Sequence, residues 1–270
     1  MNMHRLASTA FTAFALAAVA PHASAASTWN FGGSGCSGNN NATYGNTWTC
    51  GTGSTGVSAA AWSTATNTGG EGSYRTARLQ QWSGDGFGVI NRENNSGDVN
   101  SPEHSMDNER GTDLIALNFG QSVTLTSLTI GWSYNDSDIS VLAYTGGGSF
   151  PDAPVSIAGK SSADLLASGW SLVGNYADLE DDRARTINAG NISSSWWLVS
   201  AFNTAFNSGN NLDTKYRIKN DYVKLLAVAG TPYTPPPPPP GVPEPGSLAL
   251  AGIALAGAWQ VRRRKAAAGA

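Results

Sequence analysis

The feature that most constrains the fold is a run of alternating apolar residues between positions 112 and 132. Within the segment from Thr112 to Phe119, the alternating residues Ile115, Leu117 and Phe119 would share one face of an extended chain, with Leu114 and Ala116 on the other. Successive side chains of a strand point to opposite faces of its sheet, so this period of two predicts a strand. The alternation resumes after Gly120-Gln121, which predicts a turn there. It changes phase near Thr126-Ser127, which predicts a β-bulge.

Similar short segments recur along most of the chain, bounded by Gly, Asn, Ser or Asp. The further segments predicted to be strands are 73–82, 86–91, 139–144, 170–176, 185–192, 196–202 and 222–229. One short helix is predicted from Ser162 to Ser168, with Ser161 or Ser162 as its N-cap. About nine or ten short strands separated by turns predict a single all-β domain, an antiparallel β-sandwich of the jelly-roll kind.

The two ends of the chain differ in composition from the segment between them. The N-terminus has a basic Arg5, an apolar stretch and the small-residue site Ala23-Ser24-Ala25, as a cleaved signal peptide does. Near the other end, six consecutive prolines favour the stiff, extended polyproline II conformation. We therefore expect a signal peptide at 1–25, a β-sandwich surface domain at 26–230, a proline-rich linker at 231–241 and a separate tail at 242–270.

The predicted domain is acidic, which excludes one class of partner. The whole chain has 16 basic and 19 acidic residues and a formal charge of −3. Arg5 and the four tail cations lie outside the domain, and without these five the exported portion has eleven basic residues against 19 acidic ones, a charge near −8. Nucleic-acid binding relies on Lys and Arg that neutralise phosphates, so nucleic acid is not expected as a partner.

Cys36 and Cys50 are the two cysteines of the chain. In an exported protein, an even number of cysteines favours a disulfide. Closing a loop of about 15 residues would stabilise the fold by roughly 3 kcal/mol. No histidine lies near either thiol, which disfavours a metal site.

The tail contains three parts in a fixed order. The motif Val242-Pro243-Glu244-Pro245 comes first, the apolar segment 246–261 follows, and the cations Arg262, Arg263, Arg264 and Lys265 come last. A helix over the apolar segment would be about 24 Å long, and long Arg side chains can close the gap to a ~30 Å hydrocarbon core. The pattern predicts a transmembrane helix whose basic cluster acts as a cytoplasmic stop-transfer signal. A buried helix of a soluble domain is disfavoured, because that helix would need a polar face.

In these residues the tail resembles the PEP-CTERM sorting signal of Gram-negative bacteria. The resemblance implies that exosortase, a membrane protease-transpeptidase, recognises Val242, Pro243, Glu244 and Pro245. It also implies an inner-membrane intermediate and final sorting to the cell surface or extracellular matrix. The host would be a Gram-negative bacterium that makes exopolysaccharide.

The middle of the chain carries a second pattern. A Trp-Gly-rich segment begins at Gln81, and a His-x-x-Asp-Asn sequence begins at His104. Ile130-Gly131-Trp132 and the acidic turn Asp136-Ser137-Asp138 follow. From roughly Trp82 to Tyr144, the chain resembles a family of exosortase-dependent surface proteins. That family has no assigned activity, so the resemblance implies no functional residues.

No catalytic residue, enzyme activity or cofactor is predicted. His104 is the one histidine outside the signal peptide, and no nucleophile motif accompanies it. A secreted polysaccharide hydrolase that uses Asp107 or Glu103 is kept as an alternative, since sequence cannot give the separation of two carboxylates.

Asp136 and Asp138 are weak candidates for a calcium site, because Ca²⁺ prefers carboxylate oxygens. Asp107, Asn108 and Asp113 offer similar oxygens, but the EF-hand pattern is not matched. Asp and Asn side chains in turns more often bond to their own backbone, so no metal site is predicted outright.

The expected function is a structural or adhesive role in an exopolysaccharide layer. A carbohydrate-binding module is the first alternative, because exposed tryptophans can stack on sugars. Trp196 and Trp197 are adjacent and would point to opposite faces of a strand, so one of them could be exposed. The ligand, the final anchor and the oligomeric state do not follow from the sequence.

Overall fold

The computed structural model describes residues 25–65, 72–92, 100–102, 104–146, 157–206, 221–233 and 245–267. The chain divides into two compact units. One covers Ala23–Tyr233, and the other covers Met1–His22 together with Thr234–Ala270. The predicted signal peptide and proline-rich linker lie almost entirely outside the described residues.

The larger unit contains the described strands, two short 3-10 helices and one α-helix. The strands are β1 (Ser27–Asn30), β2 (Cys36–Ser37), β3 (Thr47–Cys50), β4 (Val57–Ser63), β5 (Arg75–Thr76), β6 (Arg78–Trp82), β7 (Gly86–Ile90), β8 (Met106–Asp107), β9 (Asp113–Asn135), β10 (Ile139–Tyr144), β11 (Trp170–Tyr176), β12 (Arg185–Thr186), β13 (Ser194–Ala201) and β14 (Asp221–Pro232). The helices are η1 (Gly53–Thr55), α1 (Ser162–Ala167) and η2 (Thr204–Phe206).

In the described part of this unit, the strands join into one sheet of 14 strands, and every ladder between them is antiparallel. The main path runs β11-β10-β13-β9-β14-β7-β6. The predicted all-β antiparallel fold is confirmed.

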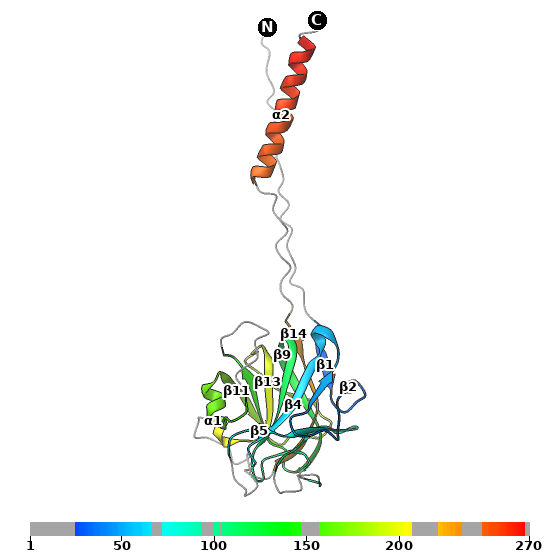
Figure 1. Ribbon diagram of the computed structural model, residues 1–270, viewed down its shortest axis with the longest axis vertical. Coiled ribbons are helices and arrows are strands. Elements are labelled where there is room, and N and C mark those ends of the chain that lie inside the picture. Colours follow the sequence, from blue (N-terminus) through cyan, green and yellow to red (C-terminus); the bar gives the residue numbers. More distant parts are fainter. Residues whose placement is uncertain are drawn as a thin grey trace, which may run out of the picture. The chain divides into compact units, whose positions relative to one another are not determined.

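β9 organises this sheet because its 23 residues pair with different strands along its length. Its first part lies between β4 and β13, and its second part pairs with β14 (Figure 1). The predicted turn at Gly120-Gln121 is wrong, since both residues remain in the strand. Neighbours hold the chain extended there: the Gly120 N–H donates to the Gly56 carbonyl at 3.2 Å. Just beyond, Val123 is paired with Ser194 on one side and Pro232 on the other.

Two extra residues in β9 change which side chains face the core. In the ladder between β9 and β14, Leu125 pairs with Gly230 and Ser127 pairs with Ala229. Thr126 between them has no paired residue on β14, which confirms the predicted bulge. Gly131 is the second extra residue, because Ile130 pairs with Leu225 and Trp132 pairs with the adjacent Lys224. A bulge reverses the alternation of the residues that follow it. Trp132 therefore leaves the face that Leu128 and Ile130 share, although the sequence pattern places all three together.

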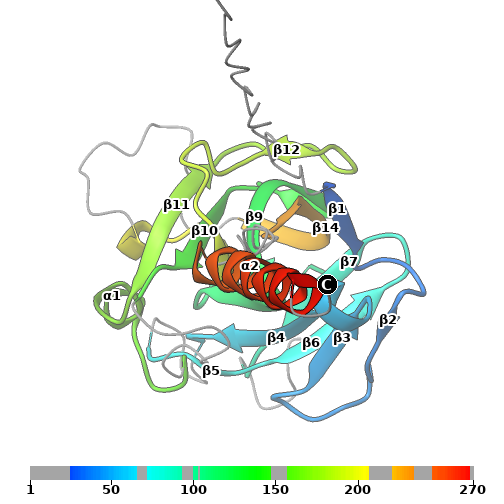
Figure 2. The same ribbon diagram turned by 90° about the horizontal axis from the view of Figure 1, so that it is seen from above.

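The core lies between strands that face each other across the domain. Seen from above, β3, β4 and β6 lie on one side and β9, β10 and β14 on the other (Figure 2). Alternate residues from these strands form one hydrophobic cluster, in which aromatic rings pack against each other. Phe31 stacks on Phe87 at 4.9 Å between ring centroids, and Trp29 meets Phe119 edge-on at 4.7 Å.

A second cluster covers the opposite face of β9, β10 and β13. Leu114, Leu142 and Leu198 pack there against Leu165 of α1 and Phe206 of η2. The predicted helix is confirmed, with Ser161 as its N-cap. The Ser161 hydroxyl accepts from the Asp164 N–H at 3.2 Å, and the Asp164 carboxylate accepts from the Ser161 N–H at 2.9 Å. This reciprocal arrangement is a capping box, which satisfies N–H groups that the helix cannot.

The predicted strand 185–192 is correct only at Arg185–Thr186. Asn188 and Asn191 both adopt positive φ, at 60° and 51°, which a strand does not allow. The Asn188 side chain instead closes a loop, accepting from the Ile192 N–H at 2.9 Å and donating to its carbonyl at 2.8 Å. The segment 57–66, for which the sequence favours no assignment, contains β4.

The predicted disulfide between Cys36 and Cys50 is confirmed. The two cysteines are directly opposite each other in the β2–β3 ladder, so the bond joins neighbouring strands. It closes the Gly- and Asn-rich segment between them.

The second unit contains the helix α2 (Pro245–Ala267). Arg262, Arg263 and Arg264 are exposed in it, and Lys265 lies in its last turns. Val242, Pro243 and Glu244 lie outside the described residues. In the portion of the chain with described structure, no helix is long and apolar enough to cross a membrane. A helix over the predicted segment is therefore confirmed, but the predicted transmembrane span is not.

Candidate functional site

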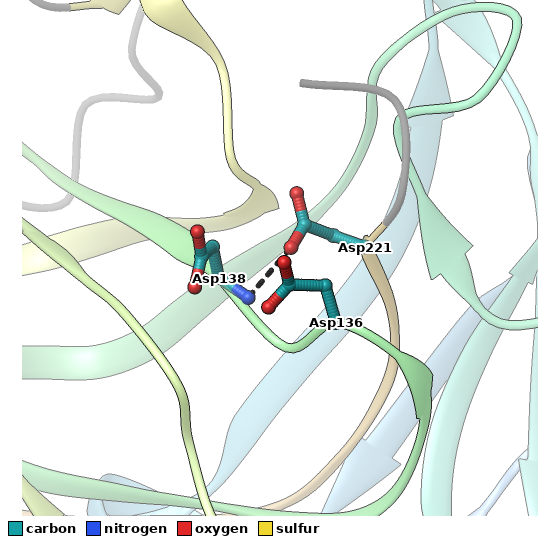
Figure 3. Close-up of side chains that lie close together, drawn as sticks. All are labelled: Asp136, Asp138 and Asp221. Carbon is teal, nitrogen blue, oxygen red and sulfur yellow. Dashed lines mark hydrogen bonds between the residues drawn. The ribbon is translucent and has the colours of Figure 1, made fainter. Parts of the chain in front are cut away.

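Three aspartates meet at one end of the sheet. Asp136 and Asp138 lie in the connection between β9 and β10, and Asp221 is the first residue of β14. Pairing of Asp221 with Asn135 brings β14 to this connection. One carboxylate oxygen from each aspartate lies within 4.8 Å of the other two. The carboxylates of Asp136 and Asp221 converge at the centre of this group (Figure 3).

N–H groups donate to each of these carboxylates. Asp221 accepts from the Asp138 backbone N–H at 2.7 Å and from the Asn108 side-chain amide at 2.5 Å. Asp138 accepts from the Asp178 N–H at 2.9 Å. Asp136 accepts from the Ser137 N–H at 2.9 Å. The three aspartates are thus held by the surrounding turns as well as by the strand pairing.

The pKa of Asp221 is strongly shifted by its surroundings. Burial raises its pKa to about 8, since the charged form is poorly solvated. The hydrogen bond from the Asp138 N–H opposes this shift, and the charge of the Asp138 carboxylate adds to it. Near neutral pH the cluster can therefore hold a proton on Asp221. Its oxygens are also of the type that Ca²⁺ prefers.

The structure brings Asp136 and Asp138 together, as the sequence suggested. It adds Asp221, which lies 83 residues after Asp138 in the chain. Asn108 contacts this group by donating its side-chain N–H to Asp221, and not through its side-chain oxygen. Asp107 and Asp113 lie elsewhere: Asp107 accepts from the Glu109 N–H at 3.0 Å, and the buried Asp113 accepts from Asn91 at 3.4 Å. Glu103 lies outside the described residues. Asp136 and Asp138 stay weak candidates for a calcium site.

A row of aromatic side chains lies on the outward face of the same strands. Its members are Trp82 of β6, His104, Trp132 and Tyr134 of β9, and Tyr222 of β14. Along this aromatic row, successive ring centroids are 4.7, 6.1, 6.5 and 5.8 Å apart. The sequence does not predict the row, because the Gly131 bulge and strand pairing create it.

Lys224 is enclosed by this aromatic row. It pairs with Trp132 across the β9–β14 ladder, and its ammonium lies 4.0 Å from the Trp132 ring centroid and 5.0 Å from that of Trp82. The Asp85 carboxylate accepts from it at 3.4 Å. Burial lowers the pKa of Lys224, and the Asp85 charge opposes that shift. The cation is therefore held by two indole faces and one carboxylate.

Trp196 and Trp197 do not form an exposed sugar platform. They point to opposite faces of β13, as predicted, but both faces are covered. Trp197 is fully buried, and its indole N–H donates to the Ser194 carbonyl at 2.9 Å. Trp196 is half-buried and packs against the second cluster. Of the two rings, one of which is expected to be exposed, Trp197 is enclosed by the main core and Trp196 stays partly exposed.

A polar cleft of about 490 Å³ lies beside the end of β11. Its wall includes Tyr176, Leu179 and the acidic and basic side chains of the loop that follows. Within that loop, Arg183 and Glu180 form an exposed ion pair.

The fold and the tail together define an all-β, disulfide-bonded domain joined to a separate C-terminal helix. Residues 241–265 match the family model described as the PEP-CTERM protein-sorting motif. The chain therefore carries a PEP-CTERM tail, which implies export, processing by exosortase and sorting to the cell surface. No curated protein and no solved structure matches the chain.

Proposed function

We propose that the β domain is a structural or adhesive component of the cell surface or extracellular matrix, within an exopolysaccharide layer. The observation that carries this proposal is the PEP-CTERM motif at residues 241–265. On this proposal, the chain passes through an inner-membrane intermediate in a Gram-negative bacterium, and exosortase then acts at Val242–Pro245.

The properties of the domain support a role outside the cell. Its strands enclose a continuous core, and a disulfide joins β2 to β3. The acidic composition favours solubility. Six prolines precede the sorting motif and provide a spacer between the domain and the tail.

We also propose that this role is not enzymatic. His104, the one histidine outside the predicted signal peptide, packs against the rings of Trp82 and Trp132. The three clustered aspartates accept hydrogen bonds from their own turns and from Asn108. These contacts support positioning roles for the polar residues.

The test is carried out in the native host. Strains lacking the gene are complemented with the wild-type chain, the Glu244→Ala variant or the Glu180→Ala variant, and matrix polysaccharide retention and cell aggregation are measured. We expect Glu244→Ala to leave the defect uncorrected, because the domain is not sorted. Glu180→Ala, which changes an exposed loop residue, should restore the phenotype. A gene deletion without any effect on the matrix contradicts the proposal.

Carbohydrate binding is a second candidate function. The specific observation that favours it is the aromatic row on the outward face of β6, β9 and β14. Binding of this kind would explain how the domain adheres to a polysaccharide layer.

A further inference from the structure

We propose that the aromatic row, centred on Trp132 and Tyr134, is a binding site for a neutral polysaccharide. This inference rests on the proposed matrix function and assigns the surface through which the domain would adhere. The apolar faces of pyranose rings would lie against the aromatic side chains, and sugar hydroxyls would bond to the polar groups beside them.

The first argument is the position of the rings on the sheet. Val223 and Leu225 of β14 point into the core, so Tyr222 and Lys224, which alternate with them along the strand, point to the outward face. Trp132 pairs with Lys224 and Tyr134 pairs with Tyr222, which places all four on the same outward face. The rings of Trp132 and Tyr134 are within 11° of parallel.

The second argument is exposure. Most aromatic residues of the domain are core residues, yet 51% of the Tyr134 surface is open to solvent. Trp82 and Trp132 are partly exposed beside it. An outward row of large rings costs solubility, and such clusters on soluble proteins mark interaction sites more often than isolated exposed residues do.

The third argument is rigidity. Lys224 lies within cation–π distance of Trp82 and Trp132, and Asp85 holds its ammonium. The Tyr222 hydroxyl donates to Glu109 at 2.9 Å. Rings that are already fixed lose little conformational entropy when a ligand binds, which favours affinity. Lys224 is thus a positioning residue that acts through the two indoles.

Charge decides the class of polysaccharide. The carboxylates of Asp85 and Glu109 border the row, and the one described cation within it, Lys224, is 3% exposed and already paired. Within the described members of the row, an acidic polysaccharide would meet these like charges and find no exposed cation to pair with. Carboxylates are good acceptors for hydroxyl groups, so the rim suits neutral sugars.

The test is affinity electrophoresis of the exported chain in native gels. The gels contain hydroxyethylcellulose, galactomannan or dextran as neutral probes, or alginate as an anionic probe. We expect at least one neutral probe, and not alginate, to retard the wild-type chain. Tyr134→Ala should weaken that binding by about fivefold or more, as for a central aromatic contact. Tyr134→Phe keeps the ring and should bind nearly as the wild type does.

Tyr233→Ala is the matched control, because Tyr233 is 56% exposed and lies outside the row. Its binding should equal that of the wild type. The proposal is overturned if no neutral probe retards the wild-type chain, or if Tyr134→Ala and Tyr233→Ala behave alike. Retardation by alginate alone overturns the choice of a neutral ligand. The matrix assay in the host does not depend on the gel assay. If the host assay contradicts the proposed matrix function while the gels still show binding, the function fails and the polysaccharide site stands.

Discussion

Replacement of Asp221 by Asn should change how the stability of the β domain depends on pH. Asp221 is fully buried, and burial raises its pKa from 3.8 to about 8. The folded protein then holds a proton that the unfolded chain releases above pH 3.8. Because the folded state binds more protons, the free energy of unfolding falls as pH rises from about 4 to about 8 and then levels off.

The size of this change in the free energy of unfolding follows from the pKa shift of Asp221. One pKa unit corresponds to about 1.4 kcal/mol, so a shift of roughly four units gives an upper bound of about 5–6 kcal/mol. Between pH 5 and pH 8, the expected loss is about 3–4 kcal/mol. Asn has no proton to lose in this range, so the Asp221→Asn variant should lack this slope.

The variant has a cost of its own. Both Asp221 oxygens accept hydrogen bonds, one from the Asp138 N–H and one from the Asn108 amide. An Asn at position 221 has an NH₂ group in place of one oxygen, and this group cannot accept a hydrogen bond. Losing that bond costs about 1–3 kcal/mol. We therefore expect the wild type to be more stable at pH 5, and the difference to shrink or reverse by pH 8.

The assay is urea unfolding at a series of pH values with the disulfide intact, followed by tryptophan fluorescence. Asp181→Asn is the control, because it removes an exposed carboxylate from the loop after β11. Parallel stability curves for wild type and Asp221→Asn between pH 5 and pH 8 would refute the burial argument.

Three further predictions test other parts of the chain. Cys36→Ser should lower the unfolding free energy by about 3 kcal/mol in urea titrations, since the Cys50 bridge is lost; an unchanged midpoint would contradict this. Gly131→Ala should destabilise by about 1–3 kcal/mol, because a Cβ there would lie 2.5 Å from the Asp85 carbonyl; equal stability would show that this approach relaxes freely. Glu244→Ala should block removal of the tail in the host, and an intact mass equal to that of the mature wild type, apart from the substitution, would refute it.

Local patterns in the sequence predict several features correctly because their causes are local. The alternation around Ile115 and Leu117 and its change of phase near Thr126 predict β9 and its first bulge. Ser161 and Asp164 form a capping box within four residues. Cys36 and Cys50 are the only possible disulfide pair within the chain.

The errors occur where strand pairing opposes a local preference. Gly120-Gln121 has turn residues, but β13 pairs with β9 before and after this point, while β4 ends and β14 begins beside it, so β9 stays extended. Trp197 faces the main core and Trp196 faces the second cluster, and no pattern within β13 reveals which of the two rings is buried.

The two candidate sites depend on tertiary structure for the same reason. Asp136 and Asp138 are evident in the sequence, but Asp221 reaches them only because β14 pairs with β9. Trp132 follows Leu128 and Ile130 in an apparent period of two, and only the bulge at Gly131 turns it outward beside Lys224. Period and composition determine which segments become strands and which segment is the sorting tail. The register between strands far apart in the chain decides which side chains meet, because each one-residue shift exchanges the inward and outward faces.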